Sequence, residues 1–147
     1  MKARVKWVDG MAFMGETESG HALIMDGAAD IGGRNLGPRP TEMVLLGLGG
    51  CTAIDVIFIL KKARQPVEDC WIEIEAERAD SVPKVFTRIH LRYVVKGGAL
   101  DPKQVERAVK LSAEKYCSVS HMLNKSAEIT HEHVLLRGDE ASQAEPA

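Results

Sequence analysis

Two of the three cysteines stand at places in the sequence where a thiol could do chemistry. Cys51 follows Gly49 and Gly50 inside a long apolar stretch, and Cys117 lies where a helix is expected to break. An odd cysteine count in a reducing compartment argues against a structural disulfide framework and leaves catalysis or metal binding. Either thiol alone has an ordinary explanation as a small packed side chain. Together, beside glycines and a loop with two arginines, they favour redox chemistry.

The residues alone leave open which thiol attacks and whether a metal is bound instead. A short helix expected to begin at Ser118 would place its positive end at Cys117 and lower the pKa of that thiol, which favours Cys117 as the nucleophile. The candidate ligands of a competing zinc site are Cys51, Cys117, His121, His131 and His133. No CxxC or HxxxH pattern supports that site, so we expect no metal and no other cofactor.

Composition and missing motifs exclude several other classes. The chain of 147 residues has a net charge of −2, so no basic surplus indicates binding to nucleic acid or to an anionic membrane. It contains no G-x-S-x-G elbow of a serine hydrolase, and its glycines lack phosphate-loop spacing. The amino terminus, MKARVKWVDG, has no apolar signal-peptide core, so we expect a cytoplasmic protein.

The element that must position Cys51 is a helix predicted over residues 41–64. Its apolar residues cover the whole circumference, which predicts a helix buried on all sides, while its uninterrupted apolar runs look too short to span a bilayer. Gly47, Gly49 and Gly50 each cost about 1 kcal/mol relative to alanine in a helix interior, which suggests that another backbone or a ligand comes close. A single chain offers too little cover for such a helix, so we expect an obligate homodimer.

Alternating apolar and polar residues predict the strands around this helix, which are 3–8, 11–18, 22–26, 71–79, 84–95 and 127–136. In the hairpin formed by the fourth and fifth strands an acidic row faces a basic row, which predicts a solvated outer face. Asp101 is expected to cap an amphipathic helix, with Gln104 closing a capping box. This order predicts an α+β fold with an antiparallel sheet, a single domain over residues 1–137, and a disordered tail over 138–147.

Two segments resemble the OsmC/Ohr family of thiol-dependent hydroperoxide reductases. GPRPTEMVLLGLGGCTAIDV, residues 37–56, is similar to the active-site helix of that family, and YCSVSHML, residues 116–123, to its second-cysteine motif. The order of elements agrees over residues 2–136, and the residues of both motifs are most similar to those of the YhfA-like branch. The resemblance implies an OsmC-like fold, with an antiparallel sheet wrapped around long central helices. It also implies an intertwined homodimer in which both chains build each active site.

The resemblance also implies an activity, the reduction of organic hydroperoxides by a thiol-dependent peroxidase. Cys51 would be the peroxidatic thiol and would become a sulfenic acid. Cys117 would resolve it to a disulfide, which a small or lipoyl-type dithiol would reduce by exchange. The alternative is an OsmC-like thiol sensor or small-molecule-binding module without strong peroxidase activity.

Two positions depart from the family pattern. The family's active-site glutamate precedes the helix cysteine by ten residues, and this chain has Thr41 there. The neighbouring Glu42 is one helical step away, which turns its side chain by about 100°. The arginine that pairs with the family's thiolate has no clear match, and Arg39 and Arg34 are the candidates. We therefore expect a thiol activity weaker than, or differently directed from, that of the best characterised relatives.

Overall fold

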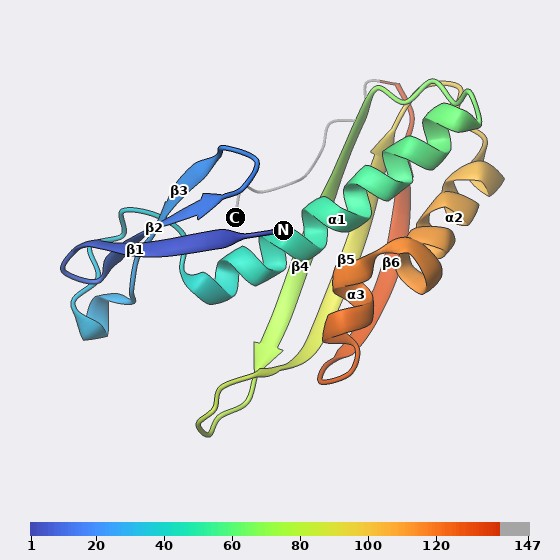
Figure 1. Cartoon of the computed structure of the whole chain (residues 1–147). Coiled ribbons are helices and arrows are strands. Elements are labelled where there is room, and N and C mark those ends of the chain that lie inside the picture. The colour runs from blue at the N-terminus through green and yellow to red at the C-terminus, as the bar shows by residue number, and fades with distance from the viewer. Residues whose placement is uncertain (139–147) are drawn as a thin grey trace. The chain divides into compact units, whose positions relative to one another are not determined.

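The computed structural model describes residues 1–138, and these fall into two compact units that divide after Leu46. Figure 1 shows the elements, which comprise two three-stranded sheets and three α-helices. The α+β class predicted from the sequence is therefore confirmed. A single domain over residues 1–137 stays a prediction. The segment predicted as a disordered tail lies outside the described residues, except for Gly138.

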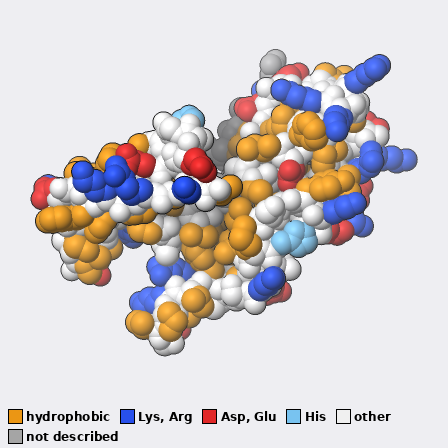
Figure 2. Space-filling view, viewed as in Figure 1, with side chains coloured by type: hydrophobic (Ala, Val, Ile, Leu, Met, Phe, Trp, Pro, Cys, Tyr) orange, Lys and Arg blue, Asp and Glu red, His pale blue; other side chains and the backbone are white. Residues whose placement is uncertain are grey.

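The first unit contains an antiparallel meander of β1 (Ala3–Asp9), β2 (Ala12–Thr17) and β3 (Ala22–Met25). All seven residues of β1 are exposed, among them Val5 and Trp7, whose exposed fractions are 61% and 63%. Figure 2 shows hydrophobic side chains on the surface of this part of the molecule. The meander therefore has apolar surface that its own unit does not cover.

The loop after β3 is organised by Asp26. Its carboxylate accepts hydrogen bonds from the backbone N–H groups of Gly27, Arg34 and Leu36 at 2.8 to 3.2 Å. The bonds from Arg34 and Leu36 hold the pKa of Asp26 below its usual range, although burial opposes them. Asp26 thereby fixes a segment that contains the short 3-10 turn η1 (Ala29–Ile31) and leads into the long helix.

The second unit contains a sheet of β4 (Asp69–Arg78), β5 (Phe86–Lys96) and β6 (Glu128–Leu136). β4 and β5 pair antiparallel, as the sequence predicts, but β6 pairs parallel to β5. The prediction of an antiparallel sheet is therefore wrong at this pairing. The reason is the connection: β5 and β6 are joined through helices, and a crossover of that kind links parallel neighbours.

The outer face of this sheet carries a ladder of charges. The cations of β5 stand between two acidic rows: Arg92 pairs with Glu73 of β4 at 2.8 Å and with Glu132 of β6 at 3.3 Å. Arg88 likewise lies 3.6 Å from both Glu77 and Glu128. All these groups are substantially exposed, so the predicted solvated face is confirmed, and each surface pair contributes at most about 1 kcal/mol.

The helices of the second unit cover the other face of its sheet, as Figure 1 shows. They are α1 (Pro40–Lys62), α2 (Pro102–Leu111), the π-helical turn η2 (Ser112–Tyr116) and α3 (Ser118–Leu123). Asp101 caps α2 as predicted, because its carboxylate accepts the Lys103 N–H at 2.9 Å. The predicted capping box with Gln104 is wrong, because the Asp101 N–H donates to the side chain of Gln65 instead, at 2.8 Å.

Helix α1 is buried on one face. Leu48, Thr52, Val56 and Leu60 recur every four residues and are fully buried. The exposed apolar side chains of α1 include Leu46, Ile54 and Phe58, at 59%, 71% and 58%. One stripe of the helix is therefore covered within the single chain, where Thr52 contacts Tyr93 of β5, and the predicted burial on all sides, which needs a partner subunit, stays a prediction.

By length and hydropathy alone α1 could cross a bilayer, since an 18-residue window has a mean hydropathy of 2.3. The sequence-based expectation concerns uninterrupted apolar runs, which this average over a window does not test, so it stays a prediction. A core helix of a soluble protein meets the same criterion, and hydrogen bonds from Thr52 tie α1 to β5 and η2 in the manner of a core helix.

Candidate redox site

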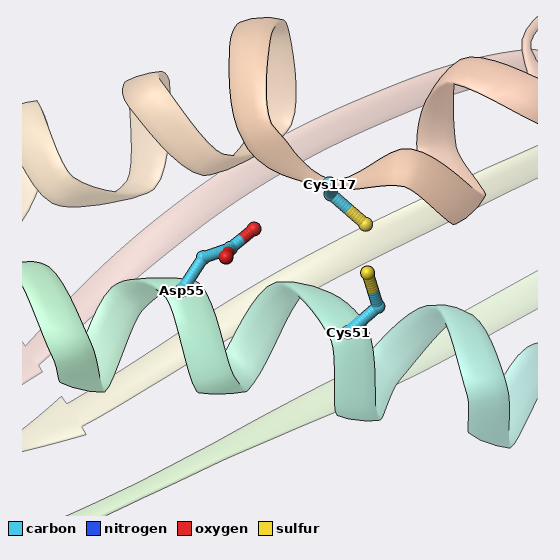
Figure 3. A group of neighbouring side chains, drawn as sticks. All are labelled: Cys51, Asp55 and Cys117. Atoms are coloured by element: carbon cyan, nitrogen blue, oxygen red, sulfur yellow. The ribbon is translucent and has the colours of Figure 1, made fainter.

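Helix α1 presents Cys51 and Asp55 one turn apart on the same side (Figure 3). It lies close to β4 at Gly49, where an added Cβ would stand 2.9 Å from Cδ1 of Ile74. Nothing lies within 4 Å of the corresponding positions at Gly47 and Gly50. The expectation that another backbone approaches the three glycines is therefore wrong within this chain. Only Gly49 has a close neighbour, and that neighbour is a side chain.

Cys117 is positioned by the break between η2 and α3. The Cys117 N–H donates to the carbonyl of Ser112 at 3.0 Å, which closes the wide π-helical turn. The backbone then becomes extended at Cys117 and α3 begins at Ser118, so the predicted break and short helix are confirmed. Cys117 is the N-cap, and its Sγ accepts the Ser120 N–H at 3.4 Å.

The two thiols lie close to each other. Sγ of Cys51, Sγ of Cys117 and a carboxylate oxygen of Asp55 all lie within 4.8 Å of one another. Figure 3 shows the thiols pointing toward each other from α1 and from the segment before α3. Both are reduced. A disulfide bond measures about 2.05 Å, so closing this one requires only a modest local movement.

Burial is the main influence on the pKa of Cys117, whose side chain is fully buried. It raises the pKa of the Cys117 thiol, and the neighbouring Cys51 raises it further, while the hydrogen bonds from Ser120 oppose them. The sequence-based expectation of a lowered pKa is therefore wrong, because the end of a six-residue helix does not offset the loss of solvent. This removes the pKa argument for Cys117 as the attacking thiol.

A chain of hydroxyl groups lies behind the thiols. Thr52 Oγ1 is 2.6 Å from both Tyr93 Oη and Ser112 Oγ, and Ser112 Oγ–H donates to Asp55 Oδ2 at 3.2 Å. Thr52, Tyr93 and Ser112 are fully buried, and burial raises the pKa of Tyr93 to about 12. Sequence reasoning missed this network. The available signal was Thr52, a polar residue beside Cys51 in an apolar helix.

The other residues named from the sequence lie in the first unit. The Arg34 guanidinium pairs with Asp9 at 3.0 Å. The Glu42 carboxylate accepts the Arg39 N–H at 2.8 Å and so satisfies the first turn of α1, where Thr41 is half-buried. Within residues 1–138, the Arg39 guanidinium has no ion-pair partner, which leaves Arg39 available to an anionic group.

The histidines of the competing zinc interpretation are elsewhere. His121 Nε2 lies 3.2 Å from the Lys115 carbonyl, and the His131 ring stands edge-on to Tyr93 with centroids 6.2 Å apart. His133 is exposed. In the described part of the chain no histidine joins the two thiols and Asp55. Cys51, Asp55 and Cys117 remain as three donors that could hold a metal ion, fewer than the four ligands of a structural zinc site but as many as an open catalytic site uses.

Asp55 also borders a groove of about 510 Å³ between α1 and the α2–η2 segment. Apolar side chains of Phe58, Ile59 and Leu111 line the groove, and Lys62 and Arg107 supply positive charge. The carboxylate of Asp55 therefore lies beside both the thiol pair and this surface groove.

Comparison with known proteins agrees with this fold. The sequence model of OsmC-like proteins matches residues 32–132, which is well over half of the chain. The chain therefore belongs to the OsmC-like protein family, and the family expected from the two motifs is confirmed. Protein YhfA of Escherichia coli (strain K12) is 50% identical over 133 residues, which cover 90% of this chain and 96% of that protein.

Solved structures extend the comparison. A hypothetical protein from Aquifex aeolicus VF5 is 33% identical with a TM-score of 0.75, and the match covers 91% of this chain and 96% of that one. An organic hydroperoxide resistance protein OsmC from Legionella pneumophila has a TM-score of 0.65 at 17% identity, with 93% and 96% covered. At that identity the likeness shows a shared fold and nothing further.

Proposed function

We propose that the chain is a thiol-dependent peroxidase that reduces organic hydroperoxides through Cys51 and Cys117. The observation that carries the proposal is the pair of reduced thiols, which come from distant parts of the sequence and lie within 4.8 Å of each other. Further support comes from the shared fold of the Legionella protein, which is described as an organic hydroperoxide resistance protein.

The proposed cycle has three steps. The Cys51 sulfur attacks the terminal oxygen of the hydroperoxide, so that an S–O bond forms, the O–O bond breaks and the alcohol leaves after taking a proton. Cys51 is thereby oxidised by two electrons to a sulfenic acid. Cys117 then displaces hydroxide from that sulfur to give the disulfide and water. A small or lipoyl-type dithiol reduces the disulfide by two exchanges and itself becomes a disulfide.

Exposure supports this division of roles. Cys51 is half-buried, so a hydroperoxide can reach its sulfur, whereas Cys117 is fully buried. Burial also raises the pKa of Cys117, which keeps it a thiol near neutral pH. A protected thiol beside an accessible one is suited to resolving a sulfenic acid rather than to forming it.

We further propose that the working unit is a homodimer, as the family resemblance implies. Apolar side chains are exposed on β1 and on one face of α1, where Ile54 and Phe58 lie one turn apart. A second copy of the chain would bury them at an isologous interface. The same interface could bring Arg39 to a thiolate, since its guanidinium has no ion-pair partner among residues 1–138.

Two substitutions test the assignment of the thiols. With one equivalent of cumene hydroperoxide, Cys51→Ser should form no sulfenic acid, whereas Cys117→Ser should form one that persists and reacts with dimedone. Cys70→Ser is the matched control, because Cys70 lies at the start of β4, outside the cluster, and should leave the cycle intact. Full turnover by Cys51→Ser would refute the proposal.

The second candidate is a thiol sensor or small-molecule-binding module without strong peroxidase activity. Thr41 supports it, because the family's active-site glutamate is absent at that position. Turnover assays with several hydroperoxides and a dithiol separate the two functions. A sensor would form the Cys51–Cys117 disulfide once per chain and would not consume excess hydroperoxide.

A further inference from the structure

We propose that Asp55 is the proton-transfer group of the resolving step, held in place by the hydroxyl chain of Tyr93, Thr52 and Ser112. This inference rests on the proposed function and assigns a third chemical group to the same site. In the condensation of Cys117 with the Cys51 sulfenic acid, Asp55 would take the thiol proton and deliver it to the departing hydroxyl group.

The geometry places the carboxylate between both reacting sulfurs. One oxygen of Asp55 lies within 4.8 Å of Sγ of Cys51 and of Sγ of Cys117. One water molecule that makes two hydrogen bonds of ordinary length can bridge such a separation, and a proton acceptor can act through one water. Figure 3 shows the carboxylate beside the gap that the two thiols face.

The hydroxyl chain has only one direction that satisfies all of its members. If Tyr93 donates to Thr52 and Thr52 to Ser112, every hydroxyl hydrogen has an acceptor, because Ser112 Oγ lies 3.2 Å from both Asp55 Oδ2 and the carbonyl oxygen of Thr52. The opposite direction would leave the buried Tyr93 hydroxyl hydrogen without one. Ser112, at the end of this chain, can therefore donate to Asp55 and help to hold the carboxylate in place.

The resolving step needs such a group because Cys117 is buried and keeps its proton. As the Cys117 sulfur bonds to the Cys51 sulfur, its S–H bond breaks and the proton passes to Asp55. As the S–O bond of the sulfenic acid breaks, the same proton passes to the leaving hydroxide, which departs as water. Asp55 ends in its starting state, and the two electrons of the new S–S bond account for the reduction of the sulfenic acid.

The groups that face Asp55 come from several elements. Cys51 belongs to α1, Tyr93 to β5 and Cys117 to the segment before α3. On the groove side the charged or titratable neighbours are Lys62, Arg107 and Tyr116.

Asp55→Asn tests the proposal, since it preserves the shape and the bond from Ser112 but removes the proton acceptor. The fully reduced protein receives one equivalent of cumene hydroperoxide, and the dimedone-trapped sulfenic acid and the disulfide are followed by mass spectrometry. We expect sulfenic acid to form at no less than the wild-type rate and disulfide formation to slow by about 100-fold at pH 7. Asp80→Asn, an exposed turn residue with the same charge change, should match the wild type.

The pH profile separates proton transfer from a merely structural role. In Asp55→Asn the resolving rate should rise about tenfold per pH unit between pH 7 and 9, because it then depends on ionised Cys117. The wild-type rate should change much less. A slowing of less than about tenfold, or an unchanged profile, would overturn the role of Asp55 and leave the peroxidase proposal standing. Absence of both sulfenic acid and the Cys51–Cys117 disulfide in the wild type would overturn both.

A measurement on the wild type covers the case in which Asp55→Asn does not fold. The resolving step should slow about twofold or more in D₂O if a proton moves as the S–S bond forms. Equal rates in H₂O and D₂O would overturn the proposal without any variant.

Discussion

The hydroxyl oxygens of Thr52 and Tyr93 lie 2.6 Å apart although the two residues are 41 positions apart in the chain. Both side chains are fully buried, so the bond is shielded from water. It joins α1 to β5 one residue away from Cys51. The position of Cys51 over the sheet is thus tied to a polar contact inside the core.

Removing the hydroxyl group of Thr52 should destabilise the protein. Thr52→Val keeps the shape of the side chain but leaves the buried hydroxyls of Tyr93 and Ser112 each short of a partner, at about 1–3 kcal/mol for each such group. We expect the free energy of unfolding in urea to fall by about 3 kcal/mol. Thr52→Ser retains the oxygen and should lose much less. Equal stability of the valine and serine variants would contradict this reading.

The glycines of α1 should differ in their tolerance of alanine. Gly50→Ala adds a Cβ with nothing within 4 Å, so it should gain about 0.5–1 kcal/mol from helix propensity. Gly49→Ala must displace the end of Ile74, which should offset that gain. Urea unfolding of both variants at equal protein concentration measures the difference. Equal stabilisation by the two alanines would show that α1 does not lie close to β4 at Gly49.

Stability should decline in alkaline solution. Burial raises the pKa of Cys70 from 9.0 to about 11 and that of Tyr93 from 10.0 to about 12. Each group favours the folded state below its unfolded pKa, and that contribution is lost as the pH rises toward its folded pKa. The loss is at most about 1.4 kcal/mol per pH unit for each group. Urea unfolding between pH 8 and 11 should show the decline, and Cys70→Ala should make it shallower above pH 9. An unchanged pH dependence of stability in Cys70→Ala would contradict the raised pKa of Cys70.

The two loop arginines should contribute unequally to activity. Arg34 is paired with Asp9, whereas the Arg39 guanidinium has no ion-pair partner within residues 1–138. Arg39→Ala should therefore slow sulfenic acid formation by about tenfold or more, the scale expected for losing a charge that stabilises an anion. Arg34→Ala should have a much smaller effect, measured by the same stopped-flow reaction with hydroperoxide. A larger effect of Arg34→Ala than of Arg39→Ala would indicate that Arg34 is the cation that stabilises the anion.

The exposed face of α1 should control the oligomeric state. Ile54→Asp changes a side chain that is 71% exposed in the single chain, so it should barely affect an isolated subunit. If that face lies in a dimer interface, sedimentation should show a shift from dimer to monomer. Val82→Asp is the matched control, because Val82 is 87% exposed in the hairpin turn. The particle mass of this variant in sedimentation should equal that of the wild type. A wild-type monomer would refute the dimer.

Local patterns in the sequence predicted much of the fold. The long helix, the six strands, the cap at Asp101 and the break at Cys117 all follow from periodicity and turn residues, which depend on neighbours in the chain. The parallel pairing of β6 and the bond from Asp101 to Gln65 depend on contacts between distant segments. Periodicity carries no information about such contacts.

The site was predictable in part for the same reason. The two cysteines are visible as motifs, and the structure brings them together. The pKa of Cys117 could not be predicted from the position of a helix end, because burial decides it. The hydroxyl chain needs Thr52, Tyr93 and Ser112 to converge from three elements, and each residue alone has an ordinary place in its own pattern.

The parallel pairing of β5 with β6 has a consequence for the redox cycle. Cys117 lies in a segment whose two ends continue into adjacent strands, and the backbone pairing of β5 with β6 holds those strands in register. Drawing its sulfur toward Cys51 therefore cannot proceed by sliding a strand. The adjustable part is the wide turn η2, which can tighten or loosen over five residues. The oxidised and reduced proteins should thus share one rigid frame and differ in a single coil beside the thiols.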